Sequence, residues 1–281
     1  MKSLVYKFLY LLNRLQIFAK LFKTVFNFYL INRGYCENIG LLPILASNQL
    51  YVGENIFISK FKKLKIKNCI DIGSNQGEYA KQILLNTDIK KVICFEPLPE
   101  CSNNLSILKS LYKGRLHFYK LALSNKNGFS YIYYNQKKTA LASLELSANN
   151  ITYVNNNQKK KISIKKLDNF IYDEYFKNID FVKIDTEGHE KKVIEGMKNF
   201  LAKKKIKLIQ IEFGIHHLIT GDSIFNISRK FNGYIIGQLN LMNGRLLIIN
   251  PQDFLSNIYI NSVFVFVRKD FFRKNFNTLL N

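Results

Sequence analysis

Residues 68–80, NCIDIGSNQGEYA, pass from a short apolar run through a glycine-containing turn into a helical pattern. Gly73 and Gly77 let the backbone turn sharply and bring a ligand close to the first turn of the helix. Free backbone N–H groups and the helix dipole favour a carboxylate or phosphate at that point. Asp71, at the end of the strand, can instead pair with a cationic group. The stretch therefore predicts a strand–turn–helix unit that binds a charged small molecule.

A second apolar run, KKVICFEP (90–97), contains Glu96 near its end. An acidic residue about 20 residues after such a turn can accept hydrogen bonds from both hydroxyls of a ribose. The turn lacks the G-x-G-x-x-G pattern, so a nicotinamide enzyme is a poor match. A nucleoside that carries both a carboxylate and an ammonium group fits better, and S-adenosylmethionine has both.

Strands and helices alternate after this unit, which implies a parallel sheet covered on both faces. Helices are expected after the first strand to about Thr87, at 99–112 and at 190–203. Further strands are expected at 116–124, 129–134, 162–170, 181–188, 207–214, 234–240, 245–250 and 262–269.

The expected domain of the chain covers residues 68–270, with a tail at 271–281. Within it, the polar and Asn-rich stretch 136–161 is interpreted as a lid or insertion over the edge of the sheet. Before it, residues 1–67 are expected to form an N-terminal helix and a less regular connecting segment.

The N-terminal residues 1–33 have the apolar periodicity of one amphipathic helix. One interpretation is peripheral contact with a membrane through residues 1–30, and the other is a helix that caps the domain or forms a dimer contact. A signal peptide is not expected, because Lys7, Arg14 and Lys20 interrupt the apolar part. No stretch of about 18 uncharged apolar residues predicts a transmembrane helix.

The composition gives the 281-residue chain a formal net charge of +22, from 42 Lys and Arg against 20 Asp and Glu. This charge favours anionic partners, although the lysines are spread along the chain, as a compositional bias would produce. The four cysteines form no CxxC pair. Cys69 and Cys94 lie in apolar runs, so we expect small buried thiols in a reducing, cytoplasmic compartment.

The motifs together resemble those of the FkbM-type family of S-adenosylmethionine-dependent methyltransferases. CIDIGSNQGEYA resembles the D-x-G-x-N-x-G cofactor turn of the family, and VICFEPLPE its acidic second strand. Three further segments resemble family motifs: LALSNKNG, KLDNF and, as the most specific, FVKIDTEGHEKKVIEGM. The resemblance covers about residues 68–214 and departs from the family pattern at Lys166, where threonine is usual.

This resemblance implies an α/β fold with a doubly wound, mostly parallel seven-stranded sheet, preceded here by the N-terminal helical extension. It also implies methyl transfer, most often to a hydroxyl oxygen. The cofactor residues that it implies are Asp71, Gly73, Ser74, Asn75, Gly77, Glu96, Ala122 and Leu123.

The candidate catalytic residues lie toward the carboxyl ends of the expected strands at 181–188 and 207–214, where the ends of neighbouring strands meet. His189 has the pKa range of a base at neutral pH. Asp185 can take a proton, orient His189 or, with Glu212, hold a divalent metal ion through oxygen ligands. Glu187 belongs to the same cluster, although it can simply cap the next helix, as Glu190 is expected to do.

Two adjacent histidines, His216 and His217, follow the last of these strands and can line a substrate cleft. They cannot both face one metal ion from a strand, so at least one is expected to be an ordinary surface residue.

The acceptor of the methyl group is expected to be a glycan or a glycolipid precursor. A nucleic-acid methyltransferase is the first alternative, suggested by the positive charge. It is disfavoured because DTEG stands where base-nitrogen methyltransferases carry a Pro-Pro-aromatic motif. A polyketide or lipid acceptor is the second alternative, and a non-enzymatic scaffold at a membrane is the third.

Overall fold

The computed structural model describes residues 52–204, 206–240, 243–257 and 261–280. Its centre is an eight-stranded sheet with the strand order β10-β9-β11-β8-β7-β1-β2-β3. The strands are β1 (Asn68–Ile72), β2 (Lys91–Phe95), β3 (Leu116–Tyr119), β7 (Phe181–Ile184), β8 (Leu208–Phe213), β9 (Tyr234–Leu239), β10 (Leu246–Ile248) and β11 (Ser262–Arg268).

The five strands β3, β2, β1, β7 and β8 are parallel, and β11, β9 and β10 continue the sheet in antiparallel pairing. Strands β1, β2 and β7 are buried along nearly their whole length because helices cover both faces of the sheet. The predicted doubly wound, mostly parallel sheet is confirmed, with an eighth strand where the family resemblance implied seven.

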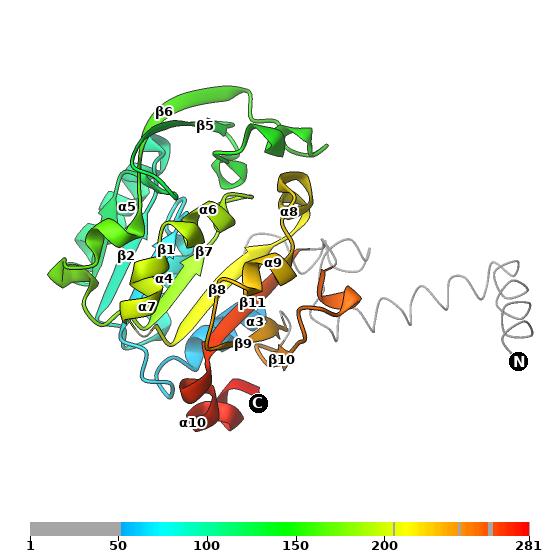
Figure 1. Cartoon of the computed structure of the whole chain (residues 1–281). Coiled ribbons are helices and arrows are strands. Elements are labelled where there is room, and N and C mark those ends of the chain that lie inside the picture. The colour runs from blue at the N-terminus through cyan, green and yellow to red at the C-terminus, as the bar shows by residue number, and fades with distance from the viewer. Residues whose placement is uncertain (1–51, 205, 241–242, 258–260, 281) are drawn as a thin grey trace, which may run out of the picture.

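Helices bury both faces of this sheet (Figure 1). One face packs against α3 (Val52–Ser59), α4 (Glu78–Asn86), α5 (Pro99–Leu111) and α10 (Lys269–Leu280). The other face packs against α6 (Glu190–Glu195), α7 (Lys198–Lys204) and α9 (Ile224–Ser228). The short helix α8 (Ile215–Thr220) follows β8 directly.

The domain extends beyond both boundaries expected from the sequence. Phe57 and Phe61, from the segment expected to be irregular, are fully buried in the core on the α3 face. At the other end, Phe272 and Leu279 of α10 pack into the same core, so residues 271–280 form a helix of the domain rather than a tail. Buried apolar side chains in both segments account for the two differences.

A second, three-stranded sheet has the order β4-β6-β5, with β4 (Ala122–Leu123), β5 (Gly128–Tyr134) and β6 (Gln158–Lys165). Figure 1 shows the β5–β6 pair arching over α6 and α8. The predicted lid, 136–161, is mainly the connection between β5 and β6, and its last residues belong to β6. The connection contains two 3-10 helices, η1 (Thr139–Leu141) and η2 (Leu146–Asn150), and η2 contacts α8.

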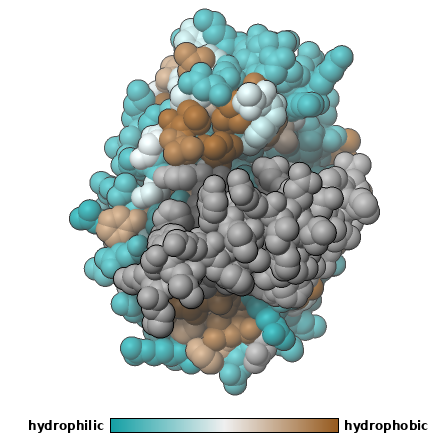
Figure 2. Space-filling view, turned by 90° about the vertical axis from the view of Figure 1, so that its right-hand side faces the viewer, coloured by the Kyte–Doolittle hydropathy of each residue, from teal (hydrophilic) through white to brown (hydrophobic). Residues whose placement is uncertain are grey.

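The predicted amphipathic helix at 1–33 and Cys36 lie outside the described residues. Cys69, Cys94 and Cys101 are buried free thiols. Among the residues that the structure describes, no helix is long and apolar enough to cross a membrane. Figure 2 shows hydrophilic side chains over much of one coloured face, with hydrophobic patches above and below the grey residues.

Candidate active site

Two cavities meet at the end of β7. The first, of about 240 Å³, is called the β1 cavity because the turn after β1 forms part of its wall together with the ends of β2 and β4. The second, of about 190 Å³, is called the α8 cavity because α8 forms part of its wall. Three carboxyl side chains line both cavities: Asp185, Glu187 and Glu212.

The turn after β1 packs directly against the turn after β7. Gly73 has φ +80°, and a Cβ atom there would lie 1.8 Å from the carbonyl oxygen of Asp185. Only glycine therefore allows the two turns to approach so closely. Asn75 keeps a left-handed backbone, with φ 44°, in the wall of the β1 cavity.

Glu96 lines the β1 cavity and holds the turn after β1. Its carboxylate accepts hydrogen bonds from the N–H groups of Asn75 and Leu98, each at 2.9 Å. Burial raises the pKa of Glu96 to about 7, although these two N–H groups oppose the shift. Ala122 and Leu123 of β4 lie in the wall of the same cavity.

The remaining predicted cofactor residues do not line the β1 cavity. Asp71 is 1% exposed and alternates with Ile70 and Ile72, so it faces the side of the sheet covered by α3 and α4. Burial raises the pKa of Asp71 to about 6, and the neighbouring Lys183 limits the shift. The expected direct contact between Asp71 and a ligand is therefore not supported.

Ser74 and Gly77 support the turn after β1 without lining the β1 cavity. The hydroxyl of Ser74 donates to the carbonyl oxygen of Asp71 at 2.8 Å. Gly77 is the N-cap of α4 and lies against Leu105 and Leu108 of α5.

Asp185 forms a buried ion pair beneath the two cavities. Its Oδ2 atom accepts a hydrogen bond from the ammonium of Lys183 at 2.6 Å, and Lys183 is 6% exposed. Burial alone would lower the pKa of Lys183, but the carboxylates of Asp185 and Asp71 outweigh it and raise that pKa. The negative charge of Asp185 is also the main reason that the pKa of Glu212 is well above its usual range, with burial second. The shared wall therefore combines an ion-paired carboxylate with a neighbouring carboxyl whose ionised form that carboxylate disfavours.

Glu190 is the first residue of α6, where the sequence predicts a helix cap, and its carboxylate also binds the turn after β7. It accepts hydrogen bonds from the N–H groups of Thr186 and Gly188, at 2.7 Å and 2.9 Å. Burial would raise the pKa of Glu190, but His217 and these backbone groups outweigh it and hold the pKa at about 2.

His189 lines the β1 cavity, but both of its ring nitrogens are already engaged. Nδ1 lies 2.6 Å from Glu145 and Nε2 lies 3.0 Å from the hydroxyl of Ser124. No nitrogen is left to take a proton from a substrate, so the structure disfavours the predicted role of His189 as the base. His189 instead contacts Glu145 and so helps to hold the 136–161 segment in place.

Both histidines of α8 are buried, at 7% and 2% exposure, so the expectation that one is a surface residue was wrong. His217 accepts a hydrogen bond from the N–H of Gly214 and stacks on Phe213. His216 lines the α8 cavity, where its Nδ1 atom lies 3.0 Å from Glu187.

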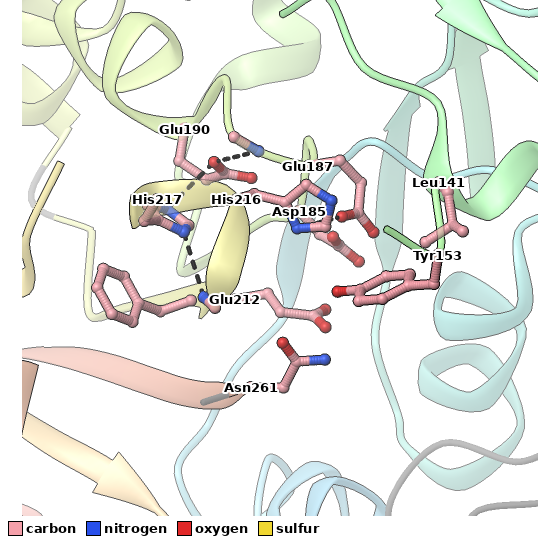
Figure 3. A pocket seen from close by; sticks show the side chains of 12 residues that line it. Leu141, Tyr153, Asp185, Glu187, Glu190, Glu212, His216, His217 and Asn261 are labelled. Atoms are coloured by element: carbon pink, nitrogen blue, oxygen red, sulfur yellow. Dashed lines mark hydrogen bonds and ion pairs between the residues drawn. The ribbon is translucent and has the colours of Figure 1, made fainter. Parts of the chain in front are cut away.

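The α8 cavity also contains residues that no sequence motif indicated. Leu141 and Tyr153 come from the connection between β5 and β6, and Asn261 precedes β11. Figure 3 shows Asp185, Glu187, Glu212 and Tyr153 turned toward a common space. Within the described parts of the chain, no group of three or more His, Cys, Asp or Glu side chains is arranged to hold a metal ion.

The chain matches the family model described as the methyltransferase FkbM domain over residues 71–228. A search of curated proteins found no match. Among solved structures, it is similar to methyltransferase FkbM from Methylobacillus flagellatus KT, with 15% identity and a TM-score of 0.45. That similarity covers 72% of this chain and 43% of the other.

Two further solved structures are similar to the chain. One is M. capricolum TrmK in complex with S-adenosylhomocysteine, with 13% identity, a TM-score of 0.42, and coverage of 78% of this chain and 70% of that one. The other is an rRNA methylase from Streptococcus thermophilus, with 9% identity, a TM-score of 0.41, and coverage of 79% and 98%. The family match itself spans more than half of the chain and both cavity-forming turns, and it confirms the resemblance seen in the motifs. The chain belongs to the FkbM family of methyltransferases.

Proposed function

We propose that the protein transfers a methyl group from S-adenosylmethionine to a hydroxyl group of a glycan or a glycolipid precursor. The observation that carries the proposal is the wall of three carboxyl side chains shared by the two cavities. A methyl donor in one cavity and an acceptor in the other would meet at this wall. Holding both in line supplies much of the catalysis in a group transfer.

The β1 cavity suits S-adenosylmethionine, which when bound supplies a methyl carbon activated by a sulfonium. The carboxylate of Glu96 can accept hydrogen bonds from the two ribose hydroxyls. Ala122 and Leu123 offer an apolar wall for a purine ring.

The α8 cavity favours a polyhydroxyl acceptor. Its lining provides the hydrogen-bonding groups of Tyr153, Asn261 and His216 beside the three carboxyls. Among the residues that the structure describes, this lining includes no Lys or Arg. A phosphate backbone would therefore meet negative charge where the reaction takes place, which argues against a nucleic-acid acceptor. The free thiols among the described residues are in keeping with a cytoplasmic location.

The acceptor class can be tested by supplying methyl-labelled S-adenosylmethionine with extracted cell-surface polysaccharide and, in parallel, with total RNA. We expect label in the polysaccharide as an ether that survives mild alkali. Label in RNA alone would overturn the glycan assignment in favour of the nucleic-acid alternative. Label found only in a lipid extract supports a glycolipid precursor if it is released with the sugar, and indicates a lipid or polyketide acceptor if it stays in the apolar part.

Replacing Glu96 with alanine should weaken the binding of S-adenosylhomocysteine by about 1.5–3 kcal/mol, because hydrogen bonds from the ribose to a charged carboxylate are lost. Calorimetry measures this change, and circular dichroism checks the fold. The fold check matters because Glu96 also binds two backbone N–H groups.

The same contact predicts a pH dependence for ligand binding. Ribose hydroxyls prefer the ionised carboxylate, and the pKa of Glu96 is about 7 before the ligand binds. Affinity should therefore fall as the pH is lowered below 7, by up to about tenfold per unit, and level off above pH 8. Glu96→Gln should show weaker binding without this dependence, and an unchanged slope would contradict the ribose contact.

A further inference from the structure

His216 has one ring nitrogen engaged, and the other has no partner among the described residues. Nδ1 lies 3.0 Å from Oε2 of Glu187, and Nε2 is buried without a hydrogen-bond partner in the part of the chain that the structure describes. The residue is 7% exposed and lines the α8 cavity (Figure 3). A buried polar atom without a partner is uncommon and marks a place where a ligand can supply the missing hydrogen bond.

The surrounding backbone holds this arrangement in place. Glu187 has φ 54°, a strained conformation for a residue with a side chain, and it presents its carboxylate to His216. The next residue, Gly188, packs so closely that a Cβ atom there would lie 3.3 Å from the Cβ of His216. The contact of Nδ1 with Glu187 thus orients the ring, and Gly188 packs close to the base of the same side chain.

We propose that His216 is the general base of the reaction and that Glu187 is the residue that positions it. This proposal rests on the proposed function, methyl transfer to a hydroxyl group. The acceptor O–H bond breaks and its proton passes to Nε2 of His216. A lone pair of the acceptor oxygen forms the new bond to the methyl carbon, and the electrons of the broken carbon–sulfur bond remain on sulfur. The imidazolium formed pairs with the Glu187 carboxylate and later releases the proton to water.

The other titratable groups at the shared wall are less suited to this role. Asp185 is paired with Lys183, and the negative charge of Asp185 raises the pKa of Glu212 and so disfavours the ionised form that could accept a proton. His189 has partners at both nitrogens. His216, with an oriented ring and a vacant nitrogen, meets the geometric requirement of a base.

A pH profile follows from the charges that face His216. These groups are Asp185, Glu187 and Glu190 from the turn after β7, Glu212 from β8, Tyr153 from the β5–β6 connection and its neighbour His217. Burial alone would lower the pKa of His216, but the hydrogen bond and charge of Glu187 outweigh it and raise that pKa above its usual value. A base must be deprotonated, so the rate should rise with pH through this raised pKa. Glu187→Gln removes the negative charge, so it should move the rise to lower pH by about one unit.

The test compares His216→Gln with His117→Gln, a control at a histidine on β3 that lines neither cavity. With methyl-labelled S-adenosylmethionine and extracted polysaccharide, His216→Gln should transfer label at least about 100-fold more slowly than the wild type. His117→Gln should match the wild type. Calorimetry with S-adenosylhomocysteine should give the same affinity in all three proteins.

A second readout does not depend on turnover. The chain has four histidines, so imidazole ¹⁵N signals can be assigned by loss of one signal in each variant. The pKa of His216 should fall in Glu187→Gln, and an unchanged value would overturn the pairing. Transfer by His216→Gln within about threefold of the wild-type rate would overturn the base and leave the proposed function standing. A wild type that binds no S-adenosylhomocysteine, or transfers no methyl group, would instead overturn the proposed function.

Discussion

Replacing Asp185 with asparagine should lower kcat by about 10²–10⁴-fold while the affinity for S-adenosylhomocysteine stays nearly unchanged. Asp185 lines both cavities and is paired with Lys183 at 2.6 Å. Asparagine keeps the shape and an oxygen that can still accept from Lys183, but it removes the negative charge. A charge at the point where the two cavities meet acts mainly in the transition state, so its loss should affect kcat more than ligand binding.

The measurement is the rate of label transfer at saturating S-adenosylmethionine, with urea unfolding to follow the fold. Stability must be followed because the change leaves the buried ammonium of Lys183 without an ionic partner at Asp185. Asp222→Asn is the matched control: Asp222 is 4% exposed and pairs with Lys191 at 2.7 Å, yet it lines neither cavity. We expect the control to work at close to the wild-type rate. If Asp185→Asn does so too, the carboxyls after β7 only shape the turn and the site is wrongly assigned.

The sheet could be predicted from the sequence because its signals are local. The run CIDIG is apolar up to the turn, and a strand followed by a helix must return to the same sheet in parallel pairing. Placing Glu212 beside Asp185 needed only the rule that carboxyl ends of neighbouring parallel strands meet, and β7 and β8 do pair.

The orientation of individual side chains could not be predicted in the same way. Asp71 ends a strand near the cavity, but alternation along β1 turns it to the other face, toward Lys183. The sequence favours His189 as the base. In the structure, Glu145 from the long β5–β6 connection contacts Nδ1 of its ring. That connection has no motif, so its contacts follow from tertiary packing alone.

His216 is an intermediate case. It follows Glu212-Phe213-Gly214, so the sequence placed it near the correct edge of the sheet. The direction of its ring depends on the short helix α8. The six residues of this helix are too few to show an apolar periodicity in the sequence. The position of His216, close after the strand that contributes Glu212, is the feature of the sequence that indicates a role in the site.

Replacing Gly73 with alanine should destabilise the protein far more than the same change at Gly114. The two glycines have nearly equal backbone angles, φ +80° and φ +78°, so the conformational cost of a side chain is the same at both. That cost is about 1 kcal/mol. Their surroundings differ: nothing lies within 4 Å of a Cβ atom at Gly114, whereas at Gly73 the carbonyl oxygen of Asp185 would lie at 1.8 Å.

A carbonyl oxygen cannot rotate away as a flexible side chain can, so the turn after β1 or the turn after β7 must move. Overpacking of this kind adds about 1–3 kcal/mol to the conformational cost. Urea unfolding of both variants measures the difference directly. Because movement of either turn changes the cavity wall at Asp185, any folded Gly73→Ala protein should also transfer methyl groups more slowly, while Gly114→Ala keeps the wild-type rate. Equal free energies of unfolding in the two variants would mean that the turns are not packed as described, and the wall shared by the two cavities would lose its structural basis.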